Sequence, residues 1–253
     1  MQVSLSHVLC FFFFVFTSDL FLFIAAHGGQ LETLQWLRTH ENFELDSWLF
    51  ASASTGGNLE VLKWLRSEGC PWDEGACSSA AEGGHFEVLK WLRSEGCPWD
   101  QSTFTFAAEG GHLETLKWLR SEGCPWDADS CAFAAGGGHF EVLKWLRNEG
   151  CPWGSIATFF AAKGGHFEVL KWLRNEGCPW DHNACAGAAE GGHVEIIDWL
   201  LDFLSPWDER ACSRAAYQGH LDVLEWHWRE GCPWISWDEK LFASAALVVT
   251  WRY

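Results

Sequence analysis

Histidine is one of the residue types in this 253-residue chain that could do chemistry, and it recurs at a fixed interval. Six histidines follow a glycine and are spaced 27 residues apart: His85, His112, His139, His166, His193 and His220. A general base is needed once in an active site, whereas a histidine present in every unit serves a need that every unit shares. We therefore interpret this column as structural, with each imidazole bonding backbone at a turn.

Cysteine, the second reactive type, falls into columns of the same period. Six cysteines follow a turn glycine (Cys70, Cys97, Cys124, Cys151, Cys178, Cys232), four lie further upstream in their units (Cys77, Cys131, Cys185, Cys212), and Cys10 stands alone. Equivalent cysteines one repeat apart would lie on helices about 8–10 Å apart. That separation exceeds the limit of about 7 Å for a disulfide and the reach of a shared zinc ion, about 2.0–2.3 Å from each ligand. We expect buried free thiols in a reducing compartment, and neither a metal nor a cofactor.

Tryptophan is unusually abundant, with 19 copies, and it also forms columns. One column is Trp64, Trp91, Trp118, Trp145, Trp172, Trp199 and Trp226; the other follows each of the 7 prolines, from Trp72 to Trp234. Two aromatic ladders could stack bases or sugars, but the net charge of −17 opposes nucleic-acid binding, which needs a basic surface. We predict packing between repeats. Nucleophile, zinc-protease and phosphate-loop motifs are absent from the sequence, which favours a non-catalytic protein.

These columns come from one repeating unit. Seven copies fill 46–234, a divergent first copy covers 18–45, a truncated last copy covers 238–253, and an apolar leader occupies 1–17. Each unit predicts two short helices. In the copy at 73–99, Asp73 caps the first helix, Gly83-Gly84 end it, and residues 86–94 form the second, with Glu87 and Lys90 placed for an ion pair. Two such helices bury their apolar faces only by stacking on neighbouring units.

The unit resembles the ankyrin repeat in its A-A-E-G-G-H-F-E-V-L-K-W-L-R-S-E-G-C-P-W stretch. The matching positions in one copy are Ala80-Ala81, Gly84-His85, Val88-Leu89, Leu92 and Gly96. It is similar in particular to the short, Trp-rich variety expanded in some protists and large DNA viruses. The resemblance implies an all-α helix-turn-helix solenoid and protein binding on the first-helix, concave face. Because the period is 27 rather than 33, the β-hairpin fingers of the family are expected to be shortened or absent.

The first helices vary between repeats far more than the second helices do. This pattern predicts a constant scaffold that reads a protein partner through its variable first-helix columns. Because aromatic residues and Arg dominate binding hot spots, the predicted contacts are Phe106, Phe133, Phe159, Phe160, Arg214 and Tyr217, with Trp48 and Lys163 as weaker candidates. The acidic column Glu82, Glu109 and Glu190 favours a partner with a basic patch. Three alternatives stay open: drift at exposed sites, a ligand-binding or enzymatic role for the Trp or His columns, and a fragment of a larger array without a selected partner.

The N-terminal leader contains an apolar run, Val8 to Phe16, which is too short to span a bilayer. A signal peptide, a hydrophobic end-cap and a mis-called gene start are the three interpretations of 1–17. The pattern as a whole favours a cytoplasmic protein, with the nucleus also open, no membrane partner and an undetermined oligomeric state.

Overall fold

The computed structural model describes residues 20–40, 43–202 and 209–229, and over these ranges the chain is helical with no strand. The first helices of the units are α3 (Ser47–Thr55), α5 (Glu74–Glu82), α7 (Gln101–Glu109), α9 (Ala128–Gly136), α11 (Ser155–Lys163), α13 (Asn183–Gly191) and α15 (Glu209–Gln218). The second helices are α2 (Leu31–His40), α4 (Leu59–Ser67), α6 (Phe86–Ser94), α8 (Leu113–Ser121), α10 (Phe140–Asn148), α12 (Phe167–Asn175), α14 (Val194–Leu201) and α16 (Leu221–Arg229). Residues 20–27 are helical as well. The helices and the lack of strands in the described ranges confirm the all-α, ankyrin-like fold class with absent hairpins.

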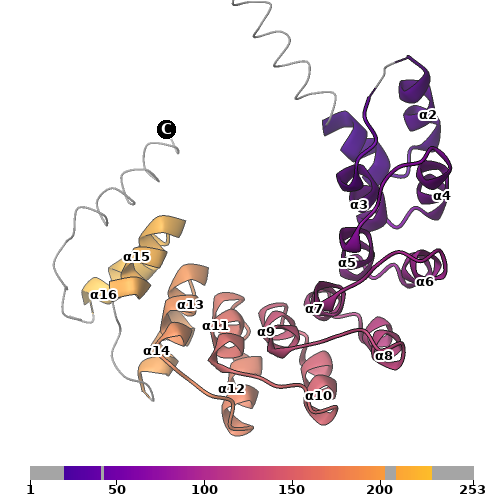
Figure 1. Cartoon of the computed structure of the whole chain (residues 1–253). Coiled ribbons are helices and arrows are strands. Elements are labelled where there is room, and N and C mark those ends of the chain that lie inside the picture. The colour runs from indigo at the N-terminus through magenta and orange to yellow at the C-terminus, as the bar shows by residue number, and fades with distance from the viewer. Residues whose placement is uncertain (1–19, 41–42, 203–208, 230–253) are drawn as a thin grey trace, which may run out of the picture. The chain divides into compact units, whose positions relative to one another are not determined.

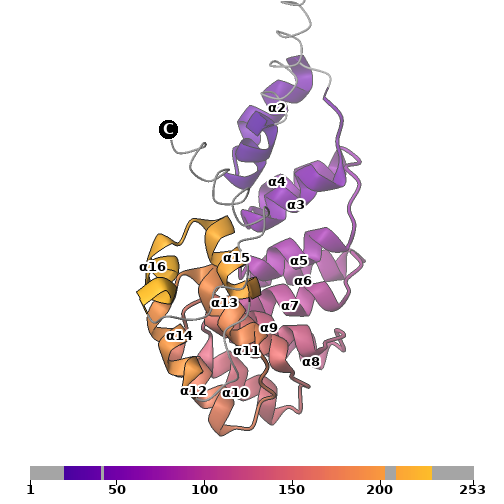
Figure 2. The same cartoon turned by 90° about the vertical axis from the view of Figure 1, so that its left-hand side faces the viewer.

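The chain divides into two compact units, Met1–Pro125 and Trp126–Tyr253, which are called the first and the second unit. The 27-residue copies within them are called repeats. Within each unit the first helices pack side by side: α3 on α5 and α5 on α7 in the first unit, α9 on α11, α11 on α13 and α13 on α15 in the second. The second helices lie behind them, so that each unit has two layers (Figures 1 and 2). We call the two layers the first-helix layer and the second-helix layer.

The aspartate at the start of the repeat caps α3, α5, α7 and α9, as the sequence predicted. The Asp73 carboxylate accepts a hydrogen bond from the Gly75 amide at 2.9 Å, and Asp46 accepts from the Leu49 amide at 2.8 Å. An unpaired amide at a helix N-terminus is thereby satisfied. Before α11, Gly154 replaces the aspartate and gives no side-chain cap. At α13 the N-cap residue is His182, and Asp181 before it accepts from the Asn183 amide.

Two glycines end each first helix from α3 to α13, but only the second adopts the left-handed conformation. Gly83 has φ −72°, whereas Gly84 has φ 71° and turns the chain into α6. The prediction that Gly83-Gly84 end the helix is confirmed, and the left-handed requirement falls on Gly84 alone. The second helix then occupies Phe86–Ser94, the range predicted from the pattern.

The core lies between the two layers and consists mainly of small residues from the first helices, with Phe50 and Phe104 among them, and of branched residues from the second helices. Ala80 and Ala81 on α5 are fully buried, as are Leu89 and Leu92 on α6. Small side chains on one layer let the helices approach closely. Each fully buried Leu stabilises the fold by roughly 1.5–3 kcal/mol.

Several predictions fall outside the described residues: the leader 1–17, the truncated copy 238–253, and Cys10, Cys232 and Trp234. Within the described ranges, no helix is both long enough and apolar enough to cross a membrane.

Candidate binding surface

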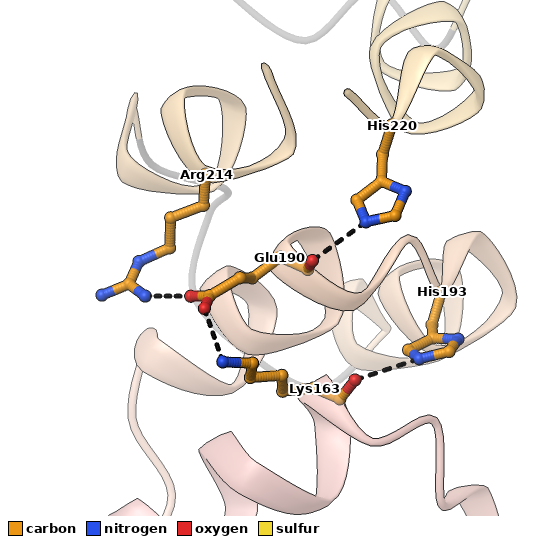
Figure 3. Close-up of polar contacts among 5 residues, drawn as sticks. All are labelled: Lys163, Glu190, His193, Arg214 and His220. Atoms are coloured by element: carbon orange, nitrogen blue, oxygen red, sulfur yellow. Dashed lines mark hydrogen bonds and ion pairs between the residues drawn. The ribbon is translucent and has the colours of Figure 1, made fainter. Parts of the chain in front are cut away.

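The histidine column joins each repeat to the first helix of the preceding repeat. In every pair with both partners in one compact unit, Nε2 lies at hydrogen-bond distance from a carbonyl oxygen near the end of that helix: His85 to Thr55 (2.8 Å), His112 to Glu82 (2.8 Å), His166 to Gly136 (2.9 Å), His193 to Lys163 (3.1 Å) and His220 to Glu190 (3.0 Å). Because a carbonyl oxygen only accepts, Nε2 carries the proton and donates. The last two bonds are drawn in Figure 3. The predicted backbone-bonding role of the column is confirmed for these histidines.

The left-handed glycine of each turn also makes room for this histidine. A Cβ placed on Gly84 would lie 2.4 Å from the imidazole of His112, and one on Gly138 would lie 2.4 Å from that of His166. Glycine is therefore required twice at this position, by its backbone conformation and by the ring of the next unit. The sequence analysis found only the first reason.

The turn cysteines donate to the carbonyl at the N-cap of the first helix of their own unit. The Sγ–O distance is 3.2 Å for Cys70 to Asp46, and the equivalent distances for Cys97, Cys124, Cys151 and Cys178 are 3.3–3.5 Å. Burial raises the pKa of the Cys70 and Cys124 thiols to about 12 and that of Cys178 to about 11. These thiols stay protonated and unreactive at neutral pH.

Two cysteines of the same unit come together, which the sequence analysis did not foresee. A hydrogen bond with Cys97, followed by burial, raises the pKa of Cys77, and a hydrogen bond with Cys151 acts in the same way on Cys131. Equivalent cysteines in different repeats were expected to lie too far apart to meet, whereas the two cysteines of each pair belong to different columns of one repeat, 20 residues apart. The nine cysteines in the described ranges are all buried and without a disulfide. Within those ranges, no three His, Cys, Asp or Glu side chains gather as a metal site.

Side chains of the second-helix layer contact one another in the same way in successive repeats. Lys90 lies 2.7 Å from the Glu87 carboxylate, which confirms the predicted pair, and its ammonium lies 4.6 Å from the centre of the Phe86 ring. The Arg93 guanidinium stacks 4.0 Å from the centre of the Trp99 ring. In the second unit Lys144, Phe140, Arg147 and Trp153 repeat these contacts.

The tryptophan columns connect adjacent repeats, as predicted. The Trp118 ring receives Trp99 and Phe86 of the preceding repeat edge-on, with ring centres 5.7 and 5.5 Å away. Trp172 receives Trp153 and Phe140 at 5.7 and 5.4 Å. Both of these tryptophans are half-buried rather than fully buried. Part of each indole therefore remains at the surface.

The first-helix layer of the second unit holds a cluster of phenylalanines, each half-buried. The Phe133 and Phe160 rings lie 5.1 Å apart, and Phe160 lies 5.3 Å from its neighbour Phe159. The Arg214 guanidinium, two repeats further along, lies 5.1 Å from the centre of the Phe159 ring. Three of the predicted phenylalanines and the predicted arginine thus form one surface.

Two glycines make this arrangement possible. A Cβ on Gly136 would lie 3.2 Å from the Cβ of Phe160, and a Cβ on Gly187 would lie 2.4 Å from the backbone oxygen of Phe159. The two adjacent phenylalanines of α11 therefore lie against opposite neighbouring helices, each at a glycine. Sequence reasoning missed both glycines. The signal was available, since each stands in a first-helix column that carries larger residues in other repeats.

Lys163, Glu190 and Arg214 form a charged cluster (Figure 3), and its arginine is the one that lies over the Phe159 ring. The Lys163 ammonium is 2.7 Å from the Glu190 carboxylate, and Arg214 binds the other oxygen of that carboxylate. Burial alone raises the pKa of Glu190, but hydrogen bonds from Lys163 and Arg214 outweigh it, so the net pKa is lowered. The Glu190 side chain is only 12 % exposed, against 43 % for Lys163 and 42 % for Arg214.

Of the other predicted contacts, Tyr217 belongs to the second unit and the rest belong to the first. Within the first unit, Glu82 is exposed, while Phe106 and Glu109 are half-buried. The pKa of Glu109 is raised, first by partial burial and then by the negative charge of Glu82. Trp48 is 75 % exposed and, in the second unit, Tyr217 is 68 % exposed. In the second unit, the Glu190 carboxylate is bound by two cations.

The geometry defines a helical repeat protein in which each repeat consists of two short helices joined by a glycine–histidine turn. Residues 182–226 match the family described as ankyrin repeats (many copies). The matched segment contains the same helix pair and the same turn as the preceding units. This segment is thus similar to ankyrin repeats.

A solved structure resembles this chain over most of its length. The crystal structure of the human ASB11 ankyrin repeat domain is 19 % identical, with 70 % of this chain and 96 % of that domain covered and a TM-score of 0.47. Among curated proteins, none gives a significant match. Ankyrin repeats are generally protein–protein interaction scaffolds and are typically not enzymes.

Proposed function

We propose that this chain is a non-catalytic scaffold that binds a protein partner through its first-helix layer. The observation that carries the proposal is the contrast between its layers. In the second-helix layer, the same Lys–Glu, Arg–Trp and Phe–Trp contacts recur, as between Lys144 and Glu141 or Arg147 and Trp153. In the first-helix layer, side chains differ from repeat to repeat, and phenylalanines and cations remain half-exposed.

A partner can be positioned in register only by residues that differ between repeats, because identical residues would allow equivalent placements one repeat apart. The half-buried Phe106, Phe133 and Phe160 supply apolar area that further burial makes favourable. Exposed Trp48 and Tyr217 and the acidic pair Glu82 and Glu109 complete the proposed set.

The test uses a partner captured from native extract by the full-length chain and two variants with three substitutions each. One changes Phe106, Phe133 and Phe160 to Ser. The matched control changes Lys90, Lys117 and Lys144, on the second helices, to Ser. Circular dichroism and thermal melting must show that both remain folded.

We expect the phenylalanine variant to lose the captured partner and the lysine variant to retain it. Loss of the partner in the lysine variant alone would place recognition on the second-helix layer and overturn the proposal. Truncating one residue of a hot spot costs about 2 kcal/mol or more in binding, so the triple change is expected to abolish capture.

A further inference from the structure

The cations of the first-helix layer gather at one place in the second unit, in a chain whose net charge is −17. Lys163 and Arg214 share the single carboxylate of Glu190, which leaves one positive charge in excess at the cluster. The acidic residues Asp129 and Asp181 lie at the opposite, N-terminal ends of α9 and α13. The surface around the cluster is therefore locally cationic.

Both cations retain hydrogen-bond donors beyond those that Glu190 uses. An ammonium has three donors and a guanidinium five, while each of these groups makes one bond to the Glu190 carboxylate. Their side chains are 43 % and 42 % exposed, whereas Glu190 is 12 % exposed. An incoming group thus meets the cations rather than the carboxylate that holds them.

The apolar part of the surface adjoins these cations directly. Arg214 lies over the Phe159 ring at 5.1 Å, and Phe159 contacts Phe160, which contacts Phe133. The ring and the carboxylate together fix the guanidinium, so little side-chain entropy remains to be lost when a ligand binds. Apolar and cationic groups are held within one continuous patch of the second unit.

From this charge complementarity we propose that the patch formed by Phe133, Phe159, Phe160, Lys163 and Arg214 binds an acidic protein segment, one that carries Asp or Glu beside an apolar or aromatic side chain. The inference rests on the proposed function and specifies the partner at this part of the layer. The segment's carboxylates pair with Lys163 and Arg214, and its apolar side chain covers Phe133 and Phe160. Glu190 then acts as a competitor that weakens binding while it orders the two cations.

The test selects short random peptides, displayed on phage, on the immobilised full-length chain. We expect enrichment of Asp and Glu next to aromatic or aliphatic residues. An enriched peptide is then synthesised, together with a copy in which Asn and Gln replace its acidic residues, and binding is measured by fluorescence anisotropy at low and high salt. Binding of the acidic peptide must exceed that of its neutral copy and weaken with salt.

Three variants identify the site. Lys163→Gln with Arg214→Gln is expected to weaken the acidic peptide by at least about fivefold, and Glu190→Gln to strengthen it by about two- to fivefold, the size of a half-exposed charge pair. Lys144→Gln with Lys171→Gln, on the second helices of the same unit, removes the same charge and is expected to leave affinity unchanged. Should the variant with both Lys163→Gln and Arg214→Gln fail to fold, two single variants still test the site. Lys163→Gln alone is expected to lower the affinity for the acidic peptide, and Glu190→Gln is expected to raise it.

The outcomes separate the two proposals. Enrichment of basic or uncharged peptides, or no enrichment at all, overturns the acidic-segment inference. If such non-acidic peptides lose binding when Phe133 and Phe160 are changed to Ser, the first-helix layer still stands as the binding surface. If enriched peptides of any charge bind equally well to that phenylalanine variant, the proposed function itself fails for this unit.

Discussion

The two layers of this protein are built on the same helical framework but use their side chains in opposite ways. In the second-helix layer, the contacts around Trp118 and Trp172 are the same contacts displaced along the array. In the first-helix layer, contacts such as Arg214 over Phe159 occur at one place. The difference teaches that repetition is kept where each unit must hold the next. Side chains differ between repeats where no such requirement exists. In this protein that is the first-helix layer, whose surface is available for recognition.

The largest expected effect is a loss of stability at high pH, and it comes from the buried cysteine thiols. Burial raises the pKa of Cys70 and Cys124 to about 12 and of Cys178 to about 11, while hydrogen bonds to Cys97 and Cys151 raise those of Cys77 and Cys131. A raised thiol pKa means that stability is complete below the unfolded pKa of about 8.5 and is lost as pH rises above it. Each such thiol then costs about 1.4 kcal/mol per pH unit.

We therefore expect urea denaturation to show the free energy of unfolding falling by several kcal/mol between pH 8.5 and 10, on the order of 1 kcal/mol for each thiol. Cys124→Ala removes one thiol and should reduce this slope by one thiol's share. Equal slopes for the variant and the wild type would mean that Cys124 titrates normally in the folded protein.

A matched pair of tryptophan substitutions compares the layers directly. Trp172→Ala removes the ring that receives Phe140 and Trp153 and should cost about 3 kcal/mol. Trp48→Ala, on the first-helix layer, removes a side chain that is 75 % exposed and should cost less than about 1 kcal/mol. Chemical denaturation measures both. Similar losses of unfolding free energy for the two variants would contradict the distinction between a second-helix layer that packs and a first-helix layer that exposes its side chains.

Two glycine substitutions test whether the singular contacts of the first-helix layer depend on close approach. Gly187→Ala places a Cβ 2.4 Å from the backbone oxygen of Phe159, and we expect a loss of about 1–3 kcal/mol. Gly136→Ala meets only the Phe160 side chain, at 3.2 Å, so the helix-propensity gain of about 1 kcal/mol offsets most of the strain. Thermal melting of both variants checks this order. An increase in melting temperature for Gly187→Ala would refute the close approach.

The smallest expected effect concerns two buried serines with different bonding. Ser130 is fully buried and its hydroxyl has no hydrogen-bond partner, whereas the equally buried Ser54 donates to the Phe50 carbonyl at 3.0 Å. Ser130→Ala should be neutral or stabilise by up to about 1 kcal/mol, because an unsatisfied hydroxyl is removed. Ser54→Ala should cost about 1 kcal/mol. A clear loss of stability for Ser130→Ala would show that its hydroxyl has a partner.

Much of the fold could be predicted because the interactions that define it are local. The cap from Asp73, the turn at Gly84, the range Phe86–Ser94 and the Glu87–Lys90 pair each involve residues within a few positions of one another. Repetition also predicted the histidine and tryptophan contacts between units, since a residue present in every copy has a role in joining copies.

The candidate surface was predicted residue by residue but not as an arrangement. Lys163, Glu190 and Arg214 are separated by 27 and 24 residues, and their common carboxylate depends on side-chain directions across three stacked helices. The same holds for Phe159 and Phe160, which lie against opposite neighbours, and for Cys77 beside Cys97. The sequence by itself determined the repeat, its helices and its turns, because these follow from short-range backbone chemistry. Only the tertiary structure decided which charges neutralise one another, because that depends on the stacking of helices brought side by side.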